Sequence, residues 1–281
     1  MNRRAEESEY GASNFTQITD YLIGRHLGSG AYASVKLATH KPTGMVLAIK
    51  VYEKFKLNEF SQRKVSVKRE INALKKLQHE NVMRLYDVID SPKQLYIVVE
   101  HIQGQMLHSY IEKLLLENNF ANFTLSSNSV RPTKNAKVNL KGPILDNGPK
   151  RLMPEPTVAI ILIQVLRAMS FAHSKNVSHR DIKPENIMYN PRTHVVKIID
   201  FGFACISKEK LRVFCGTPSF MSPEIVNKKD YSGSAADVWA CGVLLFNMLT
   251  GQVPFKATSE KELFRKISKG VYSFGKQDTK N

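Results

Sequence analysis

Cysteine is scarce in this sequence, and its few copies are scattered. Cys205, Cys215 and Cys241 are the only three among 281 residues, and no two of them form a CxxC pair. This pattern excludes a disulfide framework and argues against a structural zinc site. Structural disulfides belong to oxidising compartments, so their absence favours a cytoplasmic or a nuclear location.

Long apolar runs are also missing. The best run, residues 158–163, ends at Gln164 and is far shorter than the roughly 18 residues that a membrane helix needs. The polar first residues contain no apolar segment of a secretory signal, and Asn2 stands where N-myristoylation requires glycine. We therefore expect a protein that has no membrane partner.

Acidic residues are outnumbered. The sequence has 25 Asp and Glu against 41 Lys and Arg, which gives a formal net charge of +16. Such a balance favours polyanionic partners, although a plain solvated surface explains it equally well. The basic residues are spread over 54–76, 131–151 and the C-terminal end, and no nucleic-acid-binding motif accompanies them. We therefore do not expect nucleic acid as a partner, whereas an acidic partner suits the basic segment around 131–151.

The chain divides into a polar tail, a β-rich part and a helical part. Residues 1–20 lack periodicity, and we predict a disordered tail there. Residues 21–100 have the pattern of short strands and contain one helix with an apolar stripe, 65–77. Helical patterns dominate 101–281, interrupted by 117–153, which is rich in Asn, Ser, Lys and Pro and which we predict to be a mobile insert. The predicted strands are 21–27, 34–39, 45–51, 82–89 and 95–100, and the further predicted helices are 106–116, 158–174, 235–250 and 260–267.

A glycine-containing turn joins the first two predicted strands. Gly28, Gly30 and Ala33 make a near match to GxGxxG, which by itself fits an ordinary hairpin or half of a dinucleotide-binding fingerprint. A dinucleotide site needs a helix after the glycines and an acidic residue about 20 positions on. Here a strand follows instead, and Lys50 stands at that distance. A glycine flap whose backbone N–H groups approach phosphates fits this order better.

Lys50 comes directly after the apolar residues Leu47, Ala48 and Ile49. A lysine in this position is usually a solvated strand end. Phosphates under a glycine flap would require a cation, and that cation would require a carboxylate to hold it in place. Glu70, on the apolar-striped helix, is the candidate for this carboxylate.

Two further motifs decide between these alternatives. His179-Arg180-Asp181 opens a loop that runs to Asn186, and Asp200-Phe201-Gly202 begins 19 positions after Asp181. Each motif alone occurs by chance, but an ordered set of five at regular spacing does not. The set consists of the glycine turn 28–33, Ala48-x-Lys50, His179-Arg180-Asp181, Asp200-Phe201-Gly202 and Ser222-Pro223-Glu224.

This ordered set resembles the eukaryotic protein kinases. The resemblance extends from Tyr21 to about Ser273 and is interrupted by the insert. It implies an α+β, two-lobed fold, with a small antiparallel-sheet lobe containing one helix at 21–100 and a mainly helical lobe at 101–281. Small residues are tolerated at the third glycine position, so Ala33 is expected to change little.

The resemblance implies phosphoryl transfer from Mg-ATP, for which catalysis is mostly positioning and electrostatic stabilisation. Asp181 is then the group that accepts the hydroxyl proton, and Lys183 neutralises charge on the transferring phosphoryl group. Asn186 and Asp200 supply the oxygen ligands that Mg²⁺ prefers. The implied catalytic residues are Asp181, Lys183, Asn186, Lys50 and Glu70, and the implied metal ligands are Asn186 and Asp200.

The family also implies a slot for adenine between the two lobes. Val35 and Ala48 would cover it from one side and Met188 from the other. The backbone of Glu100 and Ile102 would bind the adenine edge. Lys50 would hold the α- and β-phosphates while Glu70 orients it. The implied ATP-binding residues are Leu27, Gly28, Ser29, Gly30, Val35, Ala48, Lys50, Glu100, Ile102, Met188 and Asp200.

The catalytic-loop sequence indicates which hydroxyl is phosphorylated. Lys183 and the run Gly216-Thr217-Pro218 have the form found in serine/threonine kinases, with Thr217 expected near Asp181 and Lys183. Residues 215–224 and 237–245 resemble the calmodulin-dependent and AMP-activated kinase group. We therefore expect protein substrates with Ser or Thr acceptors in intracellular signalling. A rival interpretation is a catalytically weak scaffold, but this chain retains the lysine and both aspartates that such scaffolds usually lack.

Three departures from the family pattern carry expectations of their own. Met106 replaces an acid that helps recognise a substrate arginine, so a preference for arginine before the acceptor is in doubt even though Glu185 is retained. Val213 stands where related kinases carry an activation-loop threonine, and Ser207 is the only hydroxyl between 203 and 216. We therefore expect that phosphorylation at the usual position, where Arg180 would grip the phosphate, is not needed. Glu224 has no arginine after Arg265 to pair with, which predicts an incomplete and marginally stable large lobe.

Overall fold

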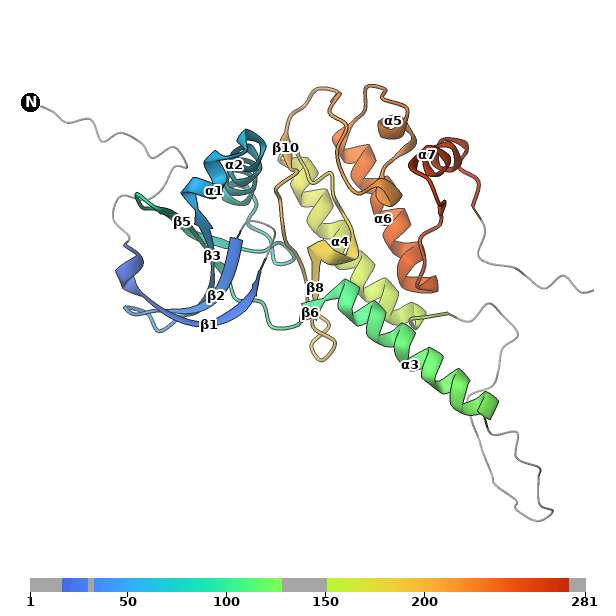
Figure 1. Ribbon diagram of the computed structural model, residues 1–281, viewed down its shortest axis with the longest axis horizontal. Helices are drawn as coiled ribbons and strands as arrows, with labels where there is room; N and C mark the ends of the chain where they lie inside the picture. The colour runs from blue at the N-terminus through green and yellow to red at the C-terminus, as the bar shows by residue number, and fades with distance from the viewer. Residues whose placement is uncertain (1–16, 30–32, 128–150, 273–281) are drawn as a thin grey trace, which may run out of the picture.

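A computed structural model of the chain describes residues 17–29, 33–127 and 151–272, with the backbone alone for 118–127. A sheet-containing small lobe and a mainly helical large lobe lie next to each other (Figure 1). The chain passes from the first lobe to the second after residue 100. This is the α+β, two-lobed architecture that the sequence predicts.

The small lobe is built on one antiparallel sheet with the strand order β1-β2-β3-β5-β4. The central strand β3 is buried on both faces, because Ala48 belongs to the main core while Leu47 and Ile49 belong to a second apolar cluster. A near-continuous apolar run is typical of such a strand. The strands are β1 (Tyr21–Ser29), β2 (Ala33–His40), β3 (Val46–Glu53), β4 (Leu85–Asp90) and β5 (Gln94–Glu100).

Helix α2 (Ser61–Lys76) packs against this sheet and carries the predicted apolar stripe. Val67, Ile71 and Leu74 are buried at helical spacing, and Glu70 is buried on the same side. The helix begins four residues earlier than predicted, and a short helix that the sequence did not predict, α1 (Lys54–Asn58), precedes it. Burying an acidic residue among apolar ones requires a partner for its carboxylate.

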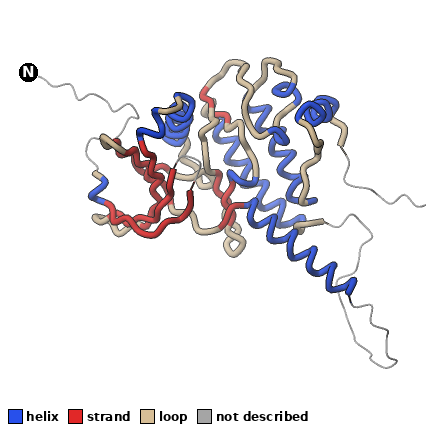
Figure 2. Tube along the Cα trace, in the orientation of Figure 1, coloured by secondary structure: helices blue, strands red, loops and turns tan. Residues whose placement is uncertain are grey.

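The large lobe contains five α-helices and five short strands within the described residues, and the strands form one two-stranded and one three-stranded sheet (Figure 2). Helices α6 and α7 end at Gly251 and Gly270, which adopt the left-handed conformation that stops a helix. The helices are α3 (Leu107–Ser127), α4 (Glu155–Ser174), α5 (Pro223–Val226), α6 (Gly233–Thr250) and α7 (Glu260–Lys269). The strands are β6 (Gln105–Met106), β7 (Val177–Ser178), β8 (Ile187–Tyr189), β9 (Val196–Ile198) and β10 (Cys205–Ile206), and the 3-10 turns of this lobe are Pro184–Asn186 and Pro218–Phe220.

Two of these helices, α4 and α6, are long and apolar enough to cross a membrane by length and composition alone. Both have a structural explanation within the lobe, because they pack against each other and bury their apolar faces in its core. In α4 the buried stripe follows helical spacing at Val158, Ile161, Val165 and Ala168. The hydropathy of α4 and α6 is therefore accounted for by packing between helices.

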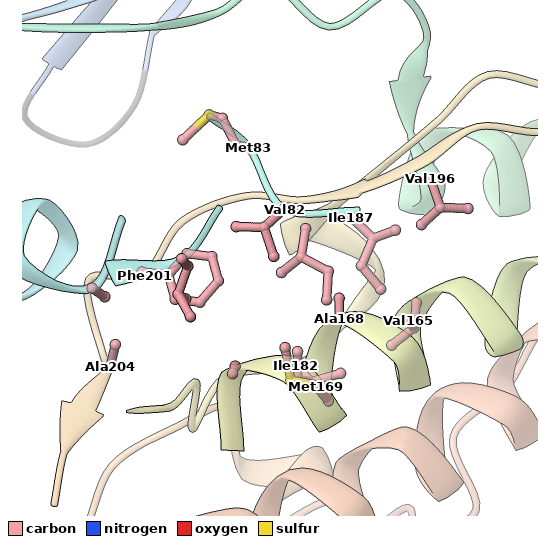
Figure 3. Packing of buried hydrophobic residues seen from close by; sticks show 14 of the residues in the cluster. Val82, Met83, Val165, Ala168, Met169, Ile182, Ile187, Val196, Phe201 and Ala204 are labelled. Atoms are coloured by element: carbon pink, nitrogen blue, oxygen red, sulfur yellow. The ribbon is translucent and has the colours of Figure 1, made fainter. Parts of the chain in front are cut away.

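One apolar core connects the two lobes. Val82 and Met83, from the segment after α2, share a cluster with Ile187 and Phe201 of the large lobe, and α4 supplies a further layer (Figure 3). Backbone hydrogen bonds reinforce this junction, since the Met83 N–H donates to the Ile198 carbonyl over 2.9 Å. The site at the junction is thus held from both sides by the same core.

Two predicted boundaries are wrong. Residues 117–127, predicted as the start of the insert, continue α3, which is consistent with the absence of Gly and Pro between Leu107 and Pro132. At the other end of the predicted insert, Met153 is buried, and the Leu152 N–H donates to the Leu249 carbonyl over 2.7 Å. Residues 128–150, on which the expected mobility and acidic partner mostly depend, lie outside the described residues.

Two smaller predictions are corrected as well. Residues 18–20 were predicted to belong to the disordered tail, but they form a 3-10 turn, and Ile18 packs against the second apolar cluster. Residues 1–16 lie outside the described part. The predicted strand 82–89 starts later, at Leu85, because Val82 forms an isolated bridge to Ile198 that ties it to the large lobe instead.

Candidate active site

The predicted lysine–glutamate pair is in contact. The Nζ atom of Lys50, on β3, forms an ion pair and hydrogen bond with Oε1 of Glu70, on α2. The Tyr52 hydroxyl donates to the other carboxylate oxygen of Glu70 over 3.3 Å, a contact that the sequence did not predict. Both oxygens of this buried carboxylate are therefore satisfied, which is what allows Glu70 to lie in the core.

Two opposing effects act on the charge of Lys50. Burial disfavours the ammonium form and by itself lowers its pKa. The negative charges of Glu70 and Asp200, together with the hydrogen bond to Glu70, outweigh burial and raise the pKa of Lys50 above its ordinary value. Lys50 is therefore a fixed positive charge at the junction, suited to phosphate oxygens.

Helix α2 is also tied to the Asp200-Phe201-Gly202 motif. The Ser66 hydroxyl donates to the Gly202 carbonyl over 3.0 Å. A Cβ at residue 202 would stand only 2.5 Å from the Ser66 oxygen, so glycine is required for this close approach. Ser66 was not predicted, because a serine on a helix face gives no signal of a partner 136 positions away.

An aromatic contact holds the next residue of that motif. The rings of Phe201 and His179 lie 4.7 Å apart, and both side chains are fully buried. Leu74 of α2 belongs to the same core, and Leu85 of β4 packs against it. The two motifs of the large lobe are thereby linked through packing to both α2 and the sheet of the small lobe.

The catalytic loop surrounds the carboxylate of Asp181 with donors. Lys183 Nζ lies 2.9 Å from Oδ2, and the Asn186 amide donates to the same oxygen over 3.0 Å. Thr217 donates to Oδ1 from its hydroxyl over 2.7 Å and from its backbone N–H over 3.0 Å. The Lys183 ammonium also donates to the Thr217 hydroxyl over 2.8 Å. The predicted proximity of Thr217 to Asp181 and Lys183 is confirmed.

Helix α6 holds the backbone of this loop through Asp237. The buried carboxylate of Asp237 accepts from the N–H groups of His179 and Arg180 over 2.8 Å and 2.7 Å. Arg180 has a φ of 65° and Asp200 a φ of 60°, a left-handed conformation that is uncommon for residues other than glycine. Such strain persists where the surrounding structure enforces it, and it clusters at functional sites.

Asn186 and Asp200 have the chemistry of a metal site. The Nδ2 group of Asn186 is occupied by donation to the backbone and side chain of Asp181, so its Oδ1 oxygen remains as a ligand. The Ile199 N–H donates to the Asn186 carbonyl over 2.9 Å, which brings the exposed Asp200 next to it along the chain. The described residues contain no cluster of three or more His, Cys, Asp or Glu side chains. A site of one amide and one carboxylate fits a magnesium ion that is otherwise held by phosphates and water.

The residues implied in adenine binding line one edge of the interlobe core. Ala48 is buried, while Leu27, Val35 and Ile102 are partly buried against it. Met188, on β8, is partly buried and stands between Met106 of β6 and Lys197 of β9 in the sheet register. An apolar surface with exposed backbone next to it is the usual environment for a nucleotide base.

The glycine turn is described only in part. Gly28 and Ser29 end β1 and pair with Val35 and Ser34 of β2, whereas Gly30 lies outside the described residues. A Cβ at Gly28 would meet no atom of the described residues within 4 Å, so they leave open space beside this glycine. The Glu100 side chain pairs with Lys197 over 2.8 Å, and its backbone N–H donates to the Arg84 carbonyl over 2.9 Å, which leaves the Glu100 carbonyl for a ligand.

Glu224 corrects an expectation from the sequence. It was predicted to be a partly buried carboxylate that loses stability without its arginine. The side chain is exposed instead, because α5 turns its neighbours Ile225 and Val226 into the core. An exposed carboxylate is solvated by water, so the lack of a cation has little effect on stability.

The comparisons with known proteins agree with this geometry. A match to the family described as "Protein kinase domain" covers residues 21–131 and 137–281. The chain is 35% identical over 260 residues to the maternal embryonic leucine zipper kinase of Danio rerio, which covers 91% of this chain and 32% of that protein. It is 32% identical over 259 residues to the CBL-interacting serine/threonine-protein kinase 15 of Arabidopsis thaliana, covering 90% of this chain and 52% of that protein.

A third relative, the CBL-interacting serine/threonine-protein kinase 24 of Arabidopsis thaliana, is 33% identical over 261 residues, which are 92% of this chain and 50% of that protein. The chain thus spans about half the length, or less, of these curated relatives. CBL-interacting kinases belong to the calmodulin-dependent group that residues 215–224 resemble, so this resemblance is confirmed. The family uses ATP together with a divalent metal ion. The motifs, their contacts and the match over both lobes lead to one conclusion: the chain belongs to the protein kinase family.

Proposed function

We propose that this chain transfers the γ-phosphoryl group of Mg-ATP to Ser or Thr hydroxyls of protein substrates in intracellular signalling. The observation that supports this most is the arrangement around Asp181, where Lys183 and Thr217 hold both carboxylate oxygens in place. A carboxylate fixed in this way can accept a proton from an incoming hydroxyl without first reorienting. The relatives' names, which include serine/threonine kinases, support the same choice of acceptor.

The reaction needs little covalent chemistry from the protein. As the hydroxyl oxygen bonds to the γ-phosphorus, its proton passes to Asp181, and the bond from that phosphorus to the bridging oxygen breaks to leave ADP. Lys183 stabilises the charge on the transferring group, and Lys50 holds the phosphates of the leaving ADP. When bound, Mg²⁺ neutralises phosphate charge, and Asn186 and Asp200 are the residues that would hold it.

The closeness of Asp181 to the segment that carries Thr217 favours Ser and Thr over Tyr as acceptors. Lys183 bridges Asp181 and Thr217, so the catalytic carboxylate lies directly beside the segment that carries Thr217. An aliphatic hydroxyl on a short side chain reaches this position when the substrate backbone lies against that segment. A tyrosine hydroxyl would hold the substrate backbone several ångströms further away.

A direct assay tests the proposal. The chain is incubated with γ-labelled ATP, Mg²⁺ and two peptide libraries, one with Ser and Thr acceptors and one with Tyr. We expect label on the Ser and Thr library only, with a turnover within the ~1–100 s⁻¹ of active kinases. The variant Asp200→Ala should show no transfer, whereas the control Asp87→Ala, on β4 outside the site, should match the unchanged chain. Label on neither library, with ATP bound, would favour the scaffold interpretation.

A further inference from the structure

The segment that leads to Thr217 is paired with a second segment just before α6. The N–H of Leu211 donates to the carbonyl of Tyr231 over 2.8 Å, and the N–H of Tyr231 donates back over 3.0 Å. Next to this bridge, Arg212 and Asp230 form an ion pair at 3.0 Å. The Arg212 side chain is 84% exposed, so this ion pair contributes little by itself. The bridge places the ring of Tyr231 beneath residues 213–215.

The hydroxyl of Tyr231 adds side-chain contacts with this segment to the two backbone hydrogen bonds of the bridge. It donates to the carbonyl of Val213 over 2.8 Å and lies 3.9 Å from the sulfur of Cys215. The residue is only 4% exposed, and its ring packs in an apolar cluster with Met221 and Ile225. Burial and the nearby Cys215 raise the pKa of Tyr231 to about 12 against the opposing effect of Arg180, so the hydroxyl remains a donor near neutral pH.

Arg180 connects this contact to the catalytic loop. Its Nε–H donates to the carbonyl of Phe203 over 2.8 Å, and its guanidinium lies close enough to Tyr231 to act on its ionisation. The segment continues from Val213 to Thr217, which is the residue that binds Asp181. The Tyr231 hydroxyl thus holds the segment four residues before its contact with the catalytic carboxylate.

We propose that Tyr231 is a positioning residue for phosphoryl transfer, whose hydroxyl sets residues 213–217 against Asp181 without any phosphate on the segment. This inference rests on the proposed kinase activity. The contact uses the backbone carbonyl of residue 213, so it does not depend on a hydroxyl or a phosphate on that side chain. Residues 213–217 lead to the contact with Asp181, the group proposed to accept the proton of the substrate hydroxyl. Losing the Tyr231 hydroxyl should therefore lower kcat/KM for the peptide substrate and leave KM for ATP unchanged.

The variant Tyr231→Phe isolates the hydroxyl. It keeps the ring in its apolar cluster and both backbone hydrogen bonds to Leu211, so the losses are confined to the hydroxyl: its donation to Val213 and its contacts with Cys215 and Arg180. The matched control is Tyr86→Phe, which removes an exposed tyrosine's hydroxyl from β4, an edge strand of the small lobe's sheet. Both are measured in the full chain after phosphatase treatment, with the absence of phosphate verified by intact mass.

Steady-state kinetics give the first test. We expect kcat/KM for a Ser/Thr peptide to fall about tenfold in Tyr231→Phe, the factor that one hydrogen bond near the upper end of the usual range supplies. KM for ATP should stay within twofold, and Tyr86→Phe should match the unchanged chain. An unchanged kcat/KM for peptide would overturn the proposal. So would an equal loss in the ATP parameters, which indicates general damage, or loss of activity in the unchanged chain on phosphatase treatment.

Hydrogen exchange gives a test that does not depend on activity. Amides of residues 213–217 should exchange about tenfold faster in Tyr231→Phe, while those of α4 keep their rates. If the unchanged chain transfers no phosphate to any peptide, the proposed function fails, but this measurement still decides whether the hydroxyl orders the segment. Equal exchange rates in both proteins would overturn the inference on its own.

Discussion

The nucleotide-facing and the hydroxyl-facing halves of the active site are held together in different ways. The first depends on one ion pair, Lys50–Glu70, between a central strand and a helix that both belong to the core. The second depends on several short hydrogen bonds around Asp181, made by residues of two loops. A single pair between regular elements is sensitive to the distance between them, whereas the loop arrangement is sensitive to the conformation of residues 213–217.

This difference indicates that the two halves can fail separately. A shift of α2 would separate Lys50 from Glu70 and weaken the hold on phosphates, with the Asp181 contacts unchanged. A change in the segment before Thr217 would disturb Asp181 while Lys50 and Glu70 remain paired. Variants that remove one contact at a time can therefore break or sharpen the comparison.

The largest effect is expected from Asp181→Asn. The amide cannot accept the hydroxyl proton, so kcat should fall about 10³-fold, within the range of a lost general base. The nucleotide-facing half is untouched, so the fold should be preserved. Initial-rate measurements on purified protein check this, with Asp87→Asn as the control of the same chemical type. Full activity in Asp181→Asn would show that another group accepts the proton.

Glu70→Gln should affect the other half. Lys50 then becomes a buried charge without its carboxylate partner, and the free energy of unfolding should fall by about 3 kcal/mol. KM for ATP should rise, since the ammonium is no longer oriented. Denaturant unfolding and ATP kinetics measure the two effects, and Glu80→Gln, an exposed residue after α2, is the control. A variant as stable as its control would mean that the pair contributes nothing.

Thr217→Val is expected to act on the hydroxyl-facing half with a smaller loss. Removing the hydroxyl takes one hydrogen bond from a charged carboxylate, worth roughly 1.5–3 kcal/mol, so kcat should fall about 10–100-fold. Thr217→Ser should restore most of the rate because it restores the hydroxyl. If Ser and Val behave alike, the methyl group rather than the hydroxyl is what matters at this position.

Glu224→Gln should have the smallest effect. The side chain is exposed, and its charge is solvated, so the free energy of unfolding should change by no more than about 0.5 kcal/mol. Thermal and denaturant unfolding against the unchanged chain check this. A loss of several kcal/mol would revive the sequence-based expectation of a buried, unpaired carboxylate.

The residues that carry the chemistry could be found from the sequence because their types and spacing are constrained by the reaction. Asp181, Lys183 and Asp200 stand in short motifs, and the order and spacing of these motifs can be recognised without knowing how the chain packs. The central strand was equally clear, since Leu47, Ala48 and Ile49 form a short apolar run. For these elements, the local pattern and the tertiary environment favour the same outcome.

The remaining contacts depend on tertiary structure and left no local pattern. Ser66 meets Gly202 across 136 positions, and Tyr231 meets Val213 from a loop before α6. The helical extension of α3 at 117–127 was missed because its many Asn and Ser residues favour loops on average. Glu224 was misplaced because a motif names a residue but does not say which way a four-residue helix turns it.

The most direct test of the account is the dissociation constant of Mg-ATP for two variants measured side by side by calorimetric titration. In Asp181→Asn the constant should stay within about twofold of the unchanged chain, because Asp181 acts on the hydroxyl. In Lys50→Met it should rise by tenfold or more, because the ammonium group that Glu70 orients, and that is proposed to hold the phosphates, is lost. Equal constants for the two variants would contradict the division of the site into two separately held halves.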